Sequence, residues 1–364
     1  MKIYYFTILC VLILKEQHVA TDTLKLVHVL FRHGDRTPTQ TYTNDPHKYW
    51  PEGWGQLTNK GKQEMYNFGL MLRETYKTFL SEYYSPNDLL VMSSYADRNL
   101  MSAQMVLAGL YPPVKEQIWN PDLLWQPIPV KYLPRSLDNI IAQKRKCQLY
   151  DAAIEAAYKS EDVQKIDKEN QDLYRYLTEN TGEEVNNIAK VETLYNTFNI
   201  EMIHNLSLPK WIDNLSMDNL RTIAAKHLAL FSDTTFMKRL KGGPFLKQVI
   251  SRMSQKSQNN LKPDLRLILY SGHDLTIVTV MRTLGFGELL KPDYAASLIF
   301  ELHQMNNNYE VKLLYKANIT ETSQLELKFC PSPCLLSDFI NGLDMVLPVD
   351  WEEECVNGVN KTLN

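Results

Sequence analysis

The strongest chemical signal in this sequence is one short stretch, Arg32-His33-Gly34-Asp35-Arg36-Thr37-Pro38. Two arginines separated by three residues can converge on one phosphoryl group, because each guanidinium presents a rigid fork of donors that matches phosphate oxygens. Between them, the imidazole of His33 can attack phosphorus and form a covalent intermediate. Gly34 is expected to let the backbone turn sharply and approach a ligand closely. We therefore predict that Arg32 and Arg36 bind a phosphoryl group and that His33 is the nucleophile.

Two further polar clusters supply the remaining groups that this chemistry needs, namely Ser93 to Arg98 and Ser271 to Asp274. Arg98 and His273 are expected to complete the phosphate site, because phosphoryl transfer depends mainly on positioning and on charge stabilisation. The leaving alcohol needs a proton, and we predict that Asp274 donates it. A carboxyl with an ordinary pKa of about 3.9 is a competent acid at low pH, or when a phosphate dianion raises its pKa. The sequence therefore predicts an acidic optimum.

Each of these features also has a simpler interpretation when it is taken alone. An Arg-His pair after a strand is often a surface ion-pair site, Arg98 could pair only with Asp97, and Asp35 could only cap its loop. Their joint placement after three apolar runs favours catalysis. Outside these clusters, His28 is expected to be a core histidine, the run Lys144 to Lys146 is interpreted as a solvated face, and three histidines are expected to have no convergent partners: His204, His227 and His303.

Three apolar runs of strand length precede the polar clusters: Leu24 to Phe31, Leu89 to Met92 and Leu265 to Tyr270. Each gives way to helical periodicity, which is typical of buried parallel strands joined through helices. In such sheets, ligands bind beyond the carboxyl ends of the strands. Near the C-terminus, Ser297 to Leu302 and Tyr309 to Tyr315 are expected to form an antiparallel hairpin at a sheet edge.

The predicted fold class is α/β, with a mostly parallel central sheet flanked by helices and a mainly helical inserted second domain. The α/β core is expected to comprise residues 21–118 and 232–364, and the insertion residues 119–231. Residues 1–20 are interpreted as a secretory signal peptide, since Lys2 precedes an apolar run of 12 residues that is too short to span a bilayer. The alternative is an N-terminal anchor, and the exact cleavage site stays open.

Composition limits the classes of function. The chain has 364 residues, 39 Lys and Arg against 42 Asp and Glu, and a formal charge of -3. This near balance argues against a protein that grips a nucleic-acid backbone over a broad surface, so any phosphate recognition must be local.

Cysteines and glycosylation sequons are consistent with an oxidising compartment. Four cysteines follow the signal peptide, an even number for which disulfides are the default interpretation and three pairings are open; they are Cys147, Cys330, Cys334 and Cys355. The spacing of Cys330 and Cys334 also suits a metal clip, but no histidine follows within ligand reach, so we expect no metal. Four N-x-[ST] sequons predict surface glycans; they lie at Asn205, Asn214, Asn318 and Asn360.

The sequence resembles the histidine acid phosphatase family, the group that includes prostatic, lysosomal and insect venom acid phosphatases. The resemblance rests on the motif from Arg32 to Pro38, on Ser94 to Ala103, on Ile118 to Val130 and on Ser271 to Asp274, and it runs from about Leu24 to Cys355.

The resemblance implies that His33 becomes a phosphohistidine and that Asp274 is the proton donor. It also implies that the phosphoryl group is bound by Arg32, Arg36, Arg98 and His273. It further implies disulfides between Cys147 and Cys355 and between Cys330 and Cys334, and it suggests a homodimer.

We therefore predict a secreted, glycosylated acid phosphatase that acts on small phosphate monoesters without a metal or other cofactor. We expect an extracellular location rather than the lysosomal lumen, no membrane span and no nucleic-acid partner, and venom secretion stays open. Two alternatives stay open as well: a phytase-like histidine phosphatase, which would share the same catalytic residues, and a non-enzymatic secreted binder.

Overall fold

A seven-stranded sheet forms the centre of the molecule, for which the computed structural model describes residues 23–358. The predicted signal peptide, residues 1–20, and the sequon at Asn360 lie outside the described residues. The strands are β1 (Leu24–Arg32), β2 (Leu89–Ser93), β3 (Lys131–Tyr132), β4 (Leu267–Gly272), β5 (Ser297–Met305), β6 (Asn308–Lys316) and β7 (Thr322–Gln324).

Helices make up most of the remaining regular structure. The α-helices are α1 (Asn59–Thr75), α2 (Asp97–Leu110), α3 (Gln148–Tyr158), α4 (Glu161–Glu169), α5 (Gln171–Thr181), α6 (Ile188–Ile203), α7 (Met217–Leu230), α8 (Thr235–Ser257), α9 (Asp274–Thr283), α10 (Leu336–Gly342) and α11 (Trp351–Asn357). Short 3-10 helices are η1 (Lys115–Gln117), η2 (Lys210–Asn214) and η3 (Asp344–Val346). Within residues 23–358, no helix combines the length and apolar character that crossing a membrane requires.

The sheet order is β3-β2-β4-β1-β5-β6-β7. β3, β2, β4 and β1 run parallel to one another, whereas β5, β6 and β7 continue the sheet in antiparallel pairs. The α/β class and the mostly parallel centre are therefore confirmed. The predicted hairpin is β5 and β6, and β7 pairs with β6 on its outer side.

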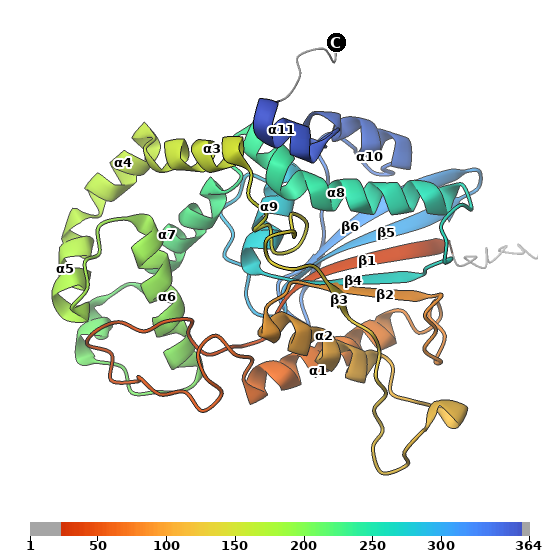
Figure 1. Cartoon of the computed structure of the whole chain (residues 1–364), viewed down its shortest axis with the longest axis horizontal. Coiled ribbons are helices and arrows are strands. Elements are labelled where there is room, and N and C mark those ends of the chain that lie inside the picture. Colours follow the sequence, from red (N-terminus) through yellow and green to blue (C-terminus); the bar gives the residue numbers. More distant parts are fainter. Residues whose placement is uncertain (1–22, 359–364) are drawn as a thin grey trace, which may run out of the picture.

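Helices cover both faces of the sheet, α1 and α2 on one side and α8 to α10 on the other (Figure 1). Strand β1 shows why its sequence is continuously apolar. Val27, Val29 and Phe31 pack on the side of α1 and α2, whereas Leu26 and Leu30 pack on the side of α8. Successive strand residues point to opposite faces, so a strand buried on both sides needs apolar residues at nearly every position.

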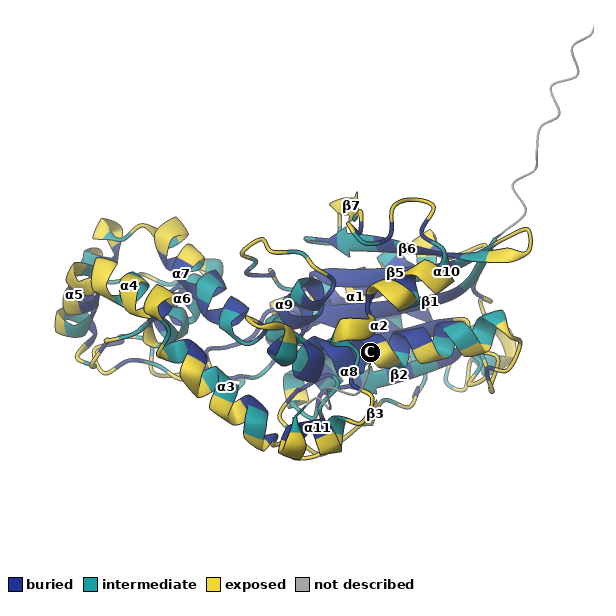
Figure 2. Cartoon of the chain, turned by 90° about the horizontal axis from the view of Figure 1, so that it is seen from above, coloured by how far each residue is buried: buried dark blue, intermediate teal, exposed yellow. Residues whose placement is uncertain are grey.

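Helices α4 to α7 lie beyond one end of the sheet, apart from the helices that cover its faces (Figure 2). They enclose an apolar cluster of their own, which includes Val191, Phe198 and Leu220. Residues Lys131–Tyr132, within the predicted insertion 119–231, form β3 at the sheet edge. The division of the chain into a core and an insertion remains a prediction.

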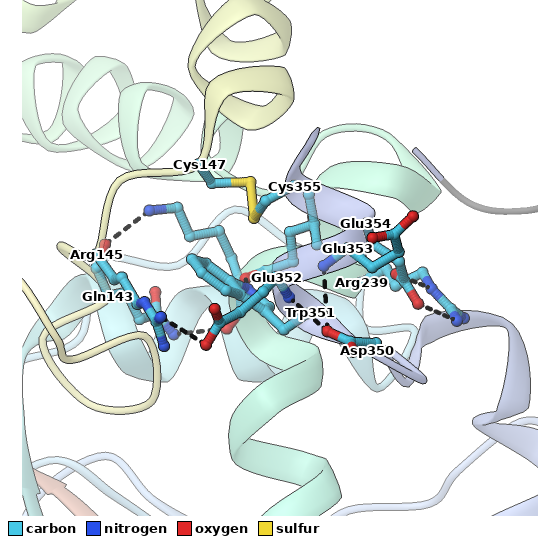
Figure 3. The surroundings of a disulfide bond; sticks show 12 residues. Gln143, Arg145, Cys147, Arg239, Asp350, Trp351, Glu352, Glu353, Glu354 and Cys355 are labelled. Atoms are coloured by element: carbon cyan, nitrogen blue, oxygen red, sulfur yellow. Dashed lines mark hydrogen bonds and ion pairs between the residues drawn. A yellow bond between two sulfur atoms is a disulfide. The ribbon is translucent and has the colours of Figure 1, made fainter. Parts of the chain in front are cut away.

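Both disulfides implied by the resemblance are present, Cys147–Cys355 and Cys330–Cys334. The first joins the residue before α3 to α11, where Arg239 and Glu354 also form a buried bidentate pair of 2.6 and 2.8 Å (Figure 3). This junction fixes the C-terminal helix against the segment that leads into the helical region.

The loop between β1 and α1 is fastened to helix α6. The ring of Tyr42 lies 5.5 Å from that of Phe198, centroid to centroid, and 6.2 Å from that of Trp211. The Thr197 hydroxyl donates to the carbonyl oxygen of Gln40 at 3.3 Å. The loop that follows the first motif therefore depends on the helical region for its conformation.

A pair of buried carboxyl groups lies at the same contact. Glu201 on α6 is fully buried, and Asp45 of the loop is itself 3% exposed. Burial, together with the negative charge of Asp45, raises the pKa of Glu201 to about 8. Glu201 is therefore neutral in acid.

This pair predicts a fold that is more stable in acid. The folded chain keeps the Glu201 proton up to about pH 8, whereas the unfolded chain releases it above about pH 4.3. The stabilisation is thus complete below the unfolded pKa and is lost as pH rises through the folded pKa. We expect Glu201→Gln, which cannot ionise, to raise Tm by several degrees at pH 7.5 and to change it little at pH 4.5, as measured by thermal unfolding.

The exposed Glu179 of α5 provides the matched control. Glu179→Gln is expected to leave the difference in Tm between the two pH values as in the wild type. If Tm falls equally in wild type and in Glu201→Gln between pH 4.5 and pH 7.5, the predicted effect of the buried Glu201 is contradicted.

Candidate active site

The three polar clusters converge at the carboxyl ends of β1, β4 and β2. Arg32 is the last residue of β1, His273 follows β4, and Arg98 is the second residue of α2. Nε of Arg98 lies 3.1 Å from Nε2 of His33, and the rings of His33 and His273 are 5.6 Å apart. The sheet thus brings together groups that are more than 200 residues apart in the sequence.

Hydrogen bonds define the tautomer of His33. Its Nδ1 lies 2.9 Å from the carbonyl oxygen of Gly34, which can only accept, so Nδ1 carries the hydrogen. Its Nε2 therefore has a free lone pair, which accepts from Nε of Arg98. Nε2 thus lies next to the guanidinium that is expected to bind the phosphoryl group, as a nucleophile for that group should.

The surroundings of His33 keep its imidazole neutral. The side chain is almost completely buried. Burial, followed by the positive charges of Arg98 and Arg32, holds the pKa of His33 well below its usual range. The lone pair on Nε2 is therefore available in acid, where a free histidine would be protonated.

The guanidiniums retain donors for an anion. Arg32 donates to the carbonyl oxygen of Pro292 at 2.6 Å and stacks over the ring of Tyr294 at 4.2 Å. Arg36 donates to the carbonyl oxygen of Thr37 at 2.9 Å. The buried Nε atoms of both arginines have no partner among the described residues. A guanidinium carries five N–H donors, so both can bind a phosphoryl oxygen without losing these anchors.

Asp274, the first residue of α9, is held by two cations. Its Oδ2 accepts from Nζ of Lys291 at 2.8 Å and lies 3.4 Å from Nη2 of Arg32, and its Oδ1 accepts from the backbone N–H of Leu275. Burial favours the neutral carboxyl, but Lys291 and Arg32 outweigh it and hold the pKa of Asp274 well below its usual range. The carboxyl is therefore ionised in this structure.

The sequence gives no signal for Lys291 and no specific role for Ser94. Lys291 is 5% exposed and also donates to Oε1 of Glu192 at 3.0 Å. Ser94 hydrogen-bonds to Nε2 of His273 at 2.9 Å. The pKa of His273 is lowered to about 3 by burial and then by the charge of Arg98, so this ring is neutral and is oriented by Ser94.

Asp35, a residue of the first motif, links the loop after β1 to Thr58 and to His204. The prediction that His204 has no convergent partner is therefore wrong. Asp35 is fully buried, and its Oδ2 accepts from the hydroxyl of Thr58 and lies 2.7 Å from Nε2 of His204. Thr58 also caps α1, where it accepts from the N–H of Gly61. His204 follows α6, so the helical region contacts the catalytic loop directly.

Gly34 lies directly against α1. A Cβ on Gly34 would lie 2.5 Å from the carbonyl oxygen of Gly61, and a Cβ on Gly61 would lie 2.1 Å from the carbonyl oxygen of Asp35. The two glycines allow the loop after β1 to rest directly on this helix. The expected close approach of Gly34 to a ligand remains a prediction.

A cavity of about 260 Å³ opens next to the cluster. Arg98, His273 and Asp274 line it together with Tyr95, Ala142, Lys144, Glu192, His227, Leu228, Phe231, Leu275 and Thr276. Lys144 and Lys146 are exposed, in agreement with the interpretation of Lys144 to Lys146 as a solvated face, and Lys144 also lines this cavity. His227, predicted to lack partners, hydrogen-bonds to the Tyr158 hydroxyl at 2.7 Å.

The remaining histidines lie away from the cavity. His28 is a buried histidine of β1, as predicted, and its Nδ1 lies 3.0 Å from the Tyr270 hydroxyl. His303 has partners in Thr23 and Glu301, contrary to the prediction. Within residues 23–358, no group of three or more His, Cys, Asp or Glu side chains is placed to hold a metal ion.

Comparison with known proteins gives a consistent result. Residues 23–316 match the family model of the histidine phosphatase superfamily (branch 2). Venom acid phosphatase Acph-1 of Apis mellifera is 35% identical over 344 residues, covering 91% of this chain and 87% of that protein. Prostatic acid phosphatase of Homo sapiens is 33% identical over 349 residues, covering 94% and 90%. The solved structure of Hafnia alvei phytase with tartrate has a TM-score of 0.70 at 16% identity, covering 92% and 99%.

The hydrogen bonds of His33 predict an observable protonation state. In protein labelled with ¹⁵N-histidine, we expect the NMR signals of His33 to report hydrogen on Nδ1 and a free Nε2 at pH 5, because burial and Arg98 lower the pKa of this ring. The signals of His33 are assigned as those that are missing from the spectrum of His33→Asn. An imidazolium at position 33 at pH 5 would contradict the neutral nucleophile.

Proposed function

Because the chain belongs to the histidine phosphatase superfamily (branch 2) and is a phosphatase, we propose that it hydrolyses phosphate monoesters through a covalent phosphohistidine on His33. One observation carries the proposal: the free Nε2 of a neutral, buried imidazole accepts from Arg98 beside two further arginines. In such an arrangement the arginines can bind a phosphoryl group, and the neighbouring imidazole can attack it.

The proposed reaction has two steps. Nε2 of His33 attacks phosphorus as the bond between phosphorus and the leaving oxygen breaks, and protonated Asp274 gives its proton to that oxygen. Water then attacks the phosphohistidine, Asp274 accepts the proton of the water, and the bond between phosphorus and nitrogen breaks. In both steps, donors of Arg32, Arg36, Arg98 and His273 stabilise the charge on the phosphoryl oxygens.

The charges around the site support an acidic optimum. Asp274 must carry a proton to protonate the leaving group, and its cationic neighbours Lys291 and Arg32 lower its pKa. A bound phosphate dianion shares Arg32 and raises the pKa of Asp274 again. His33, in contrast, must be neutral in order to attack. Its lowered pKa keeps it so in the same acidic range.

The lining of the cavity supports small monoesters over inositol hexakisphosphate. Apart from the proposed phosphoryl-binding residues, Lys144 contributes one cation to the cavity wall and Glu192 one carboxylate. The remaining wall includes Leu228 and Phe231. A substrate with six phosphates needs many more cationic donors, whereas a single alcohol fits this mixed surface.

We also propose that the enzyme is secreted and glycosylated. Two disulfides suit an oxidising compartment. Of the sequons within the described residues, Asn205 and Asn214 are exposed and Asn318 is half-buried.

The nucleophile is tested by its removal. We expect His33→Ala to abolish turnover of p-nitrophenyl phosphate at pH 5 and to prevent trapping of a ³²P-phosphoenzyme after acid quench, because it removes the neutral Nε2 that accepts from Arg98. The control is His303→Gln, since His303 lies beside the amino end of β1. If EDTA leaves the activity of the wild type unchanged, the mechanism is not metal-dependent. If the wild type itself is inactive, the chain is the non-enzymatic secreted binder instead.

The proton donor is tested by the leaving group. In Asp274→Asn, we expect turnover of an alkyl phosphate such as glycerol 2-phosphate to fall by roughly 100-fold or more. Turnover of p-nitrophenyl phosphate is expected to fall far less, because a phenolate leaves without full protonation. Equal losses on both substrates would exclude Asp274 as the donor.

A further inference from the structure

Lys291 is a buried cation at the edge of the active site. The exposed fraction of its side chain is 3%, and its Nζ lies 2.8 Å from Oδ2 of Asp274 and 3.0 Å from Oε1 of Glu192. Its donors are thus directed at two carboxylates, and its burial keeps it from the substrate. Any effect of Lys291 on the reaction must pass through Asp274.

The three charges come from separate parts of the fold. Glu192 lies on α6 in the helical region, Asp274 begins α9, and Lys291 belongs to the segment between α9 and β5. The three residues are separated in the sequence, and the packing of these segments brings them together. A buried lysine between two carboxylates stays charged, and its pair with Asp274 raises its own pKa against the effect of burial.

We propose that Lys291 and Glu192 are positioning residues that hold Oδ2 of Asp274 and set the pH range in which this carboxyl carries its proton, through their opposite charges. The proposal rests on the proposed role of Asp274 as proton donor. Lys291 stabilises the carboxylate directly, so it favours loss of the proton. Glu192 repels that carboxylate and neutralises part of the charge of Lys291, so it favours retention of the proton.

Other charged and titratable groups also face Asp274. They are Arg32 at the end of β1, His33 after it, Arg98 on α2, Lys144 before α3, His227 on α7 and His273 at the start of α9. Arg32 and Arg98 are also proposed to bind the phosphoryl group, so substrate takes up part of their charge. Lys291 makes the shortest ionic contact to Asp274 and is not a phosphate ligand, so its influence persists in the substrate complex.

The two residues predict opposite changes in one measurement. For an alkyl phosphate, kcat falls on the basic side as Asp274 loses its proton in the enzyme–substrate complex. We expect Lys291→Met to move this basic limb to higher pH by about one unit, which is a tenfold change in the protonation equilibrium. We expect Glu192→Gln to move it to lower pH, because Lys291 then acts on Asp274 without compensation.

Matched variants separate charge from packing. Lys291→Arg keeps the charge and is expected to leave the limb within a few tenths of a unit of the wild type, whereas Lys291→Met/Glu192→Gln removes both charges and should lie between the single variants. The profile with p-nitrophenyl phosphate is expected to shift less, since that leaving group depends less on the proton. If Lys291→Met does not fold, the double variant and Glu192→Gln carry the test.

The outcomes distinguish the two proposals. If Asp274→Asn slows alkyl and aryl phosphates equally, the proposed role of the donor fails first. If Asp274→Asn discriminates between them but the limb stays fixed in Lys291→Met and Glu192→Gln, or moves in the same direction in both, Lys291 and Glu192 are structural and the inference is overturned.

Discussion

Crowding of positive charge around one buried imidazole is the constraint on which the site depends. Arg32, Arg36 and Arg98 surround His33 at the carboxyl ends of parallel strands. Burial and these charges lower the pKa of His33 and keep its ring neutral in acid. In the proposed mechanism the same charges bind the phosphoryl group. One arrangement would then serve two requirements that conflict for an isolated histidine, which would be protonated at the pH where an acidic donor works.

The rest of the fold offsets this concentration of charge and fixes its geometry. Asp274 and Glu192 supply negative charge on one side through Lys291. Asp35 on the other side joins the loop after β1 to Thr58 and to His204. The helical region thus does more than cover the site, since α6 and the residue after it contribute Glu192, Glu201 and His204. Buried charges require such partners, and both α6 and the segments next to the sheet provide them here.

The proposed chemistry and the predicted stability of the fold favour acid for the same reason. The proposed donor Asp274 has to hold a proton, and the buried Glu201 near Asp45 holds one as well. Both effects are expected to weaken as pH rises, although the two carboxyl groups belong to different clusters.

The sequence by itself indicated that Arg32, His33, Arg98, His273 and Asp274 lie together, because they occur at or shortly after the ends of apolar strands, and strand ends in a parallel sheet meet at one edge. It also indicated the hairpin of β5 and β6, which is a local pattern. Only the tertiary structure brought Lys291, Glu192, His204 and Glu201 to their neighbours. Their significance comes from ion pairs and buried contacts between segments far apart in the chain, and no local spacing encodes which lysine or carboxylate the fold will bury beside another.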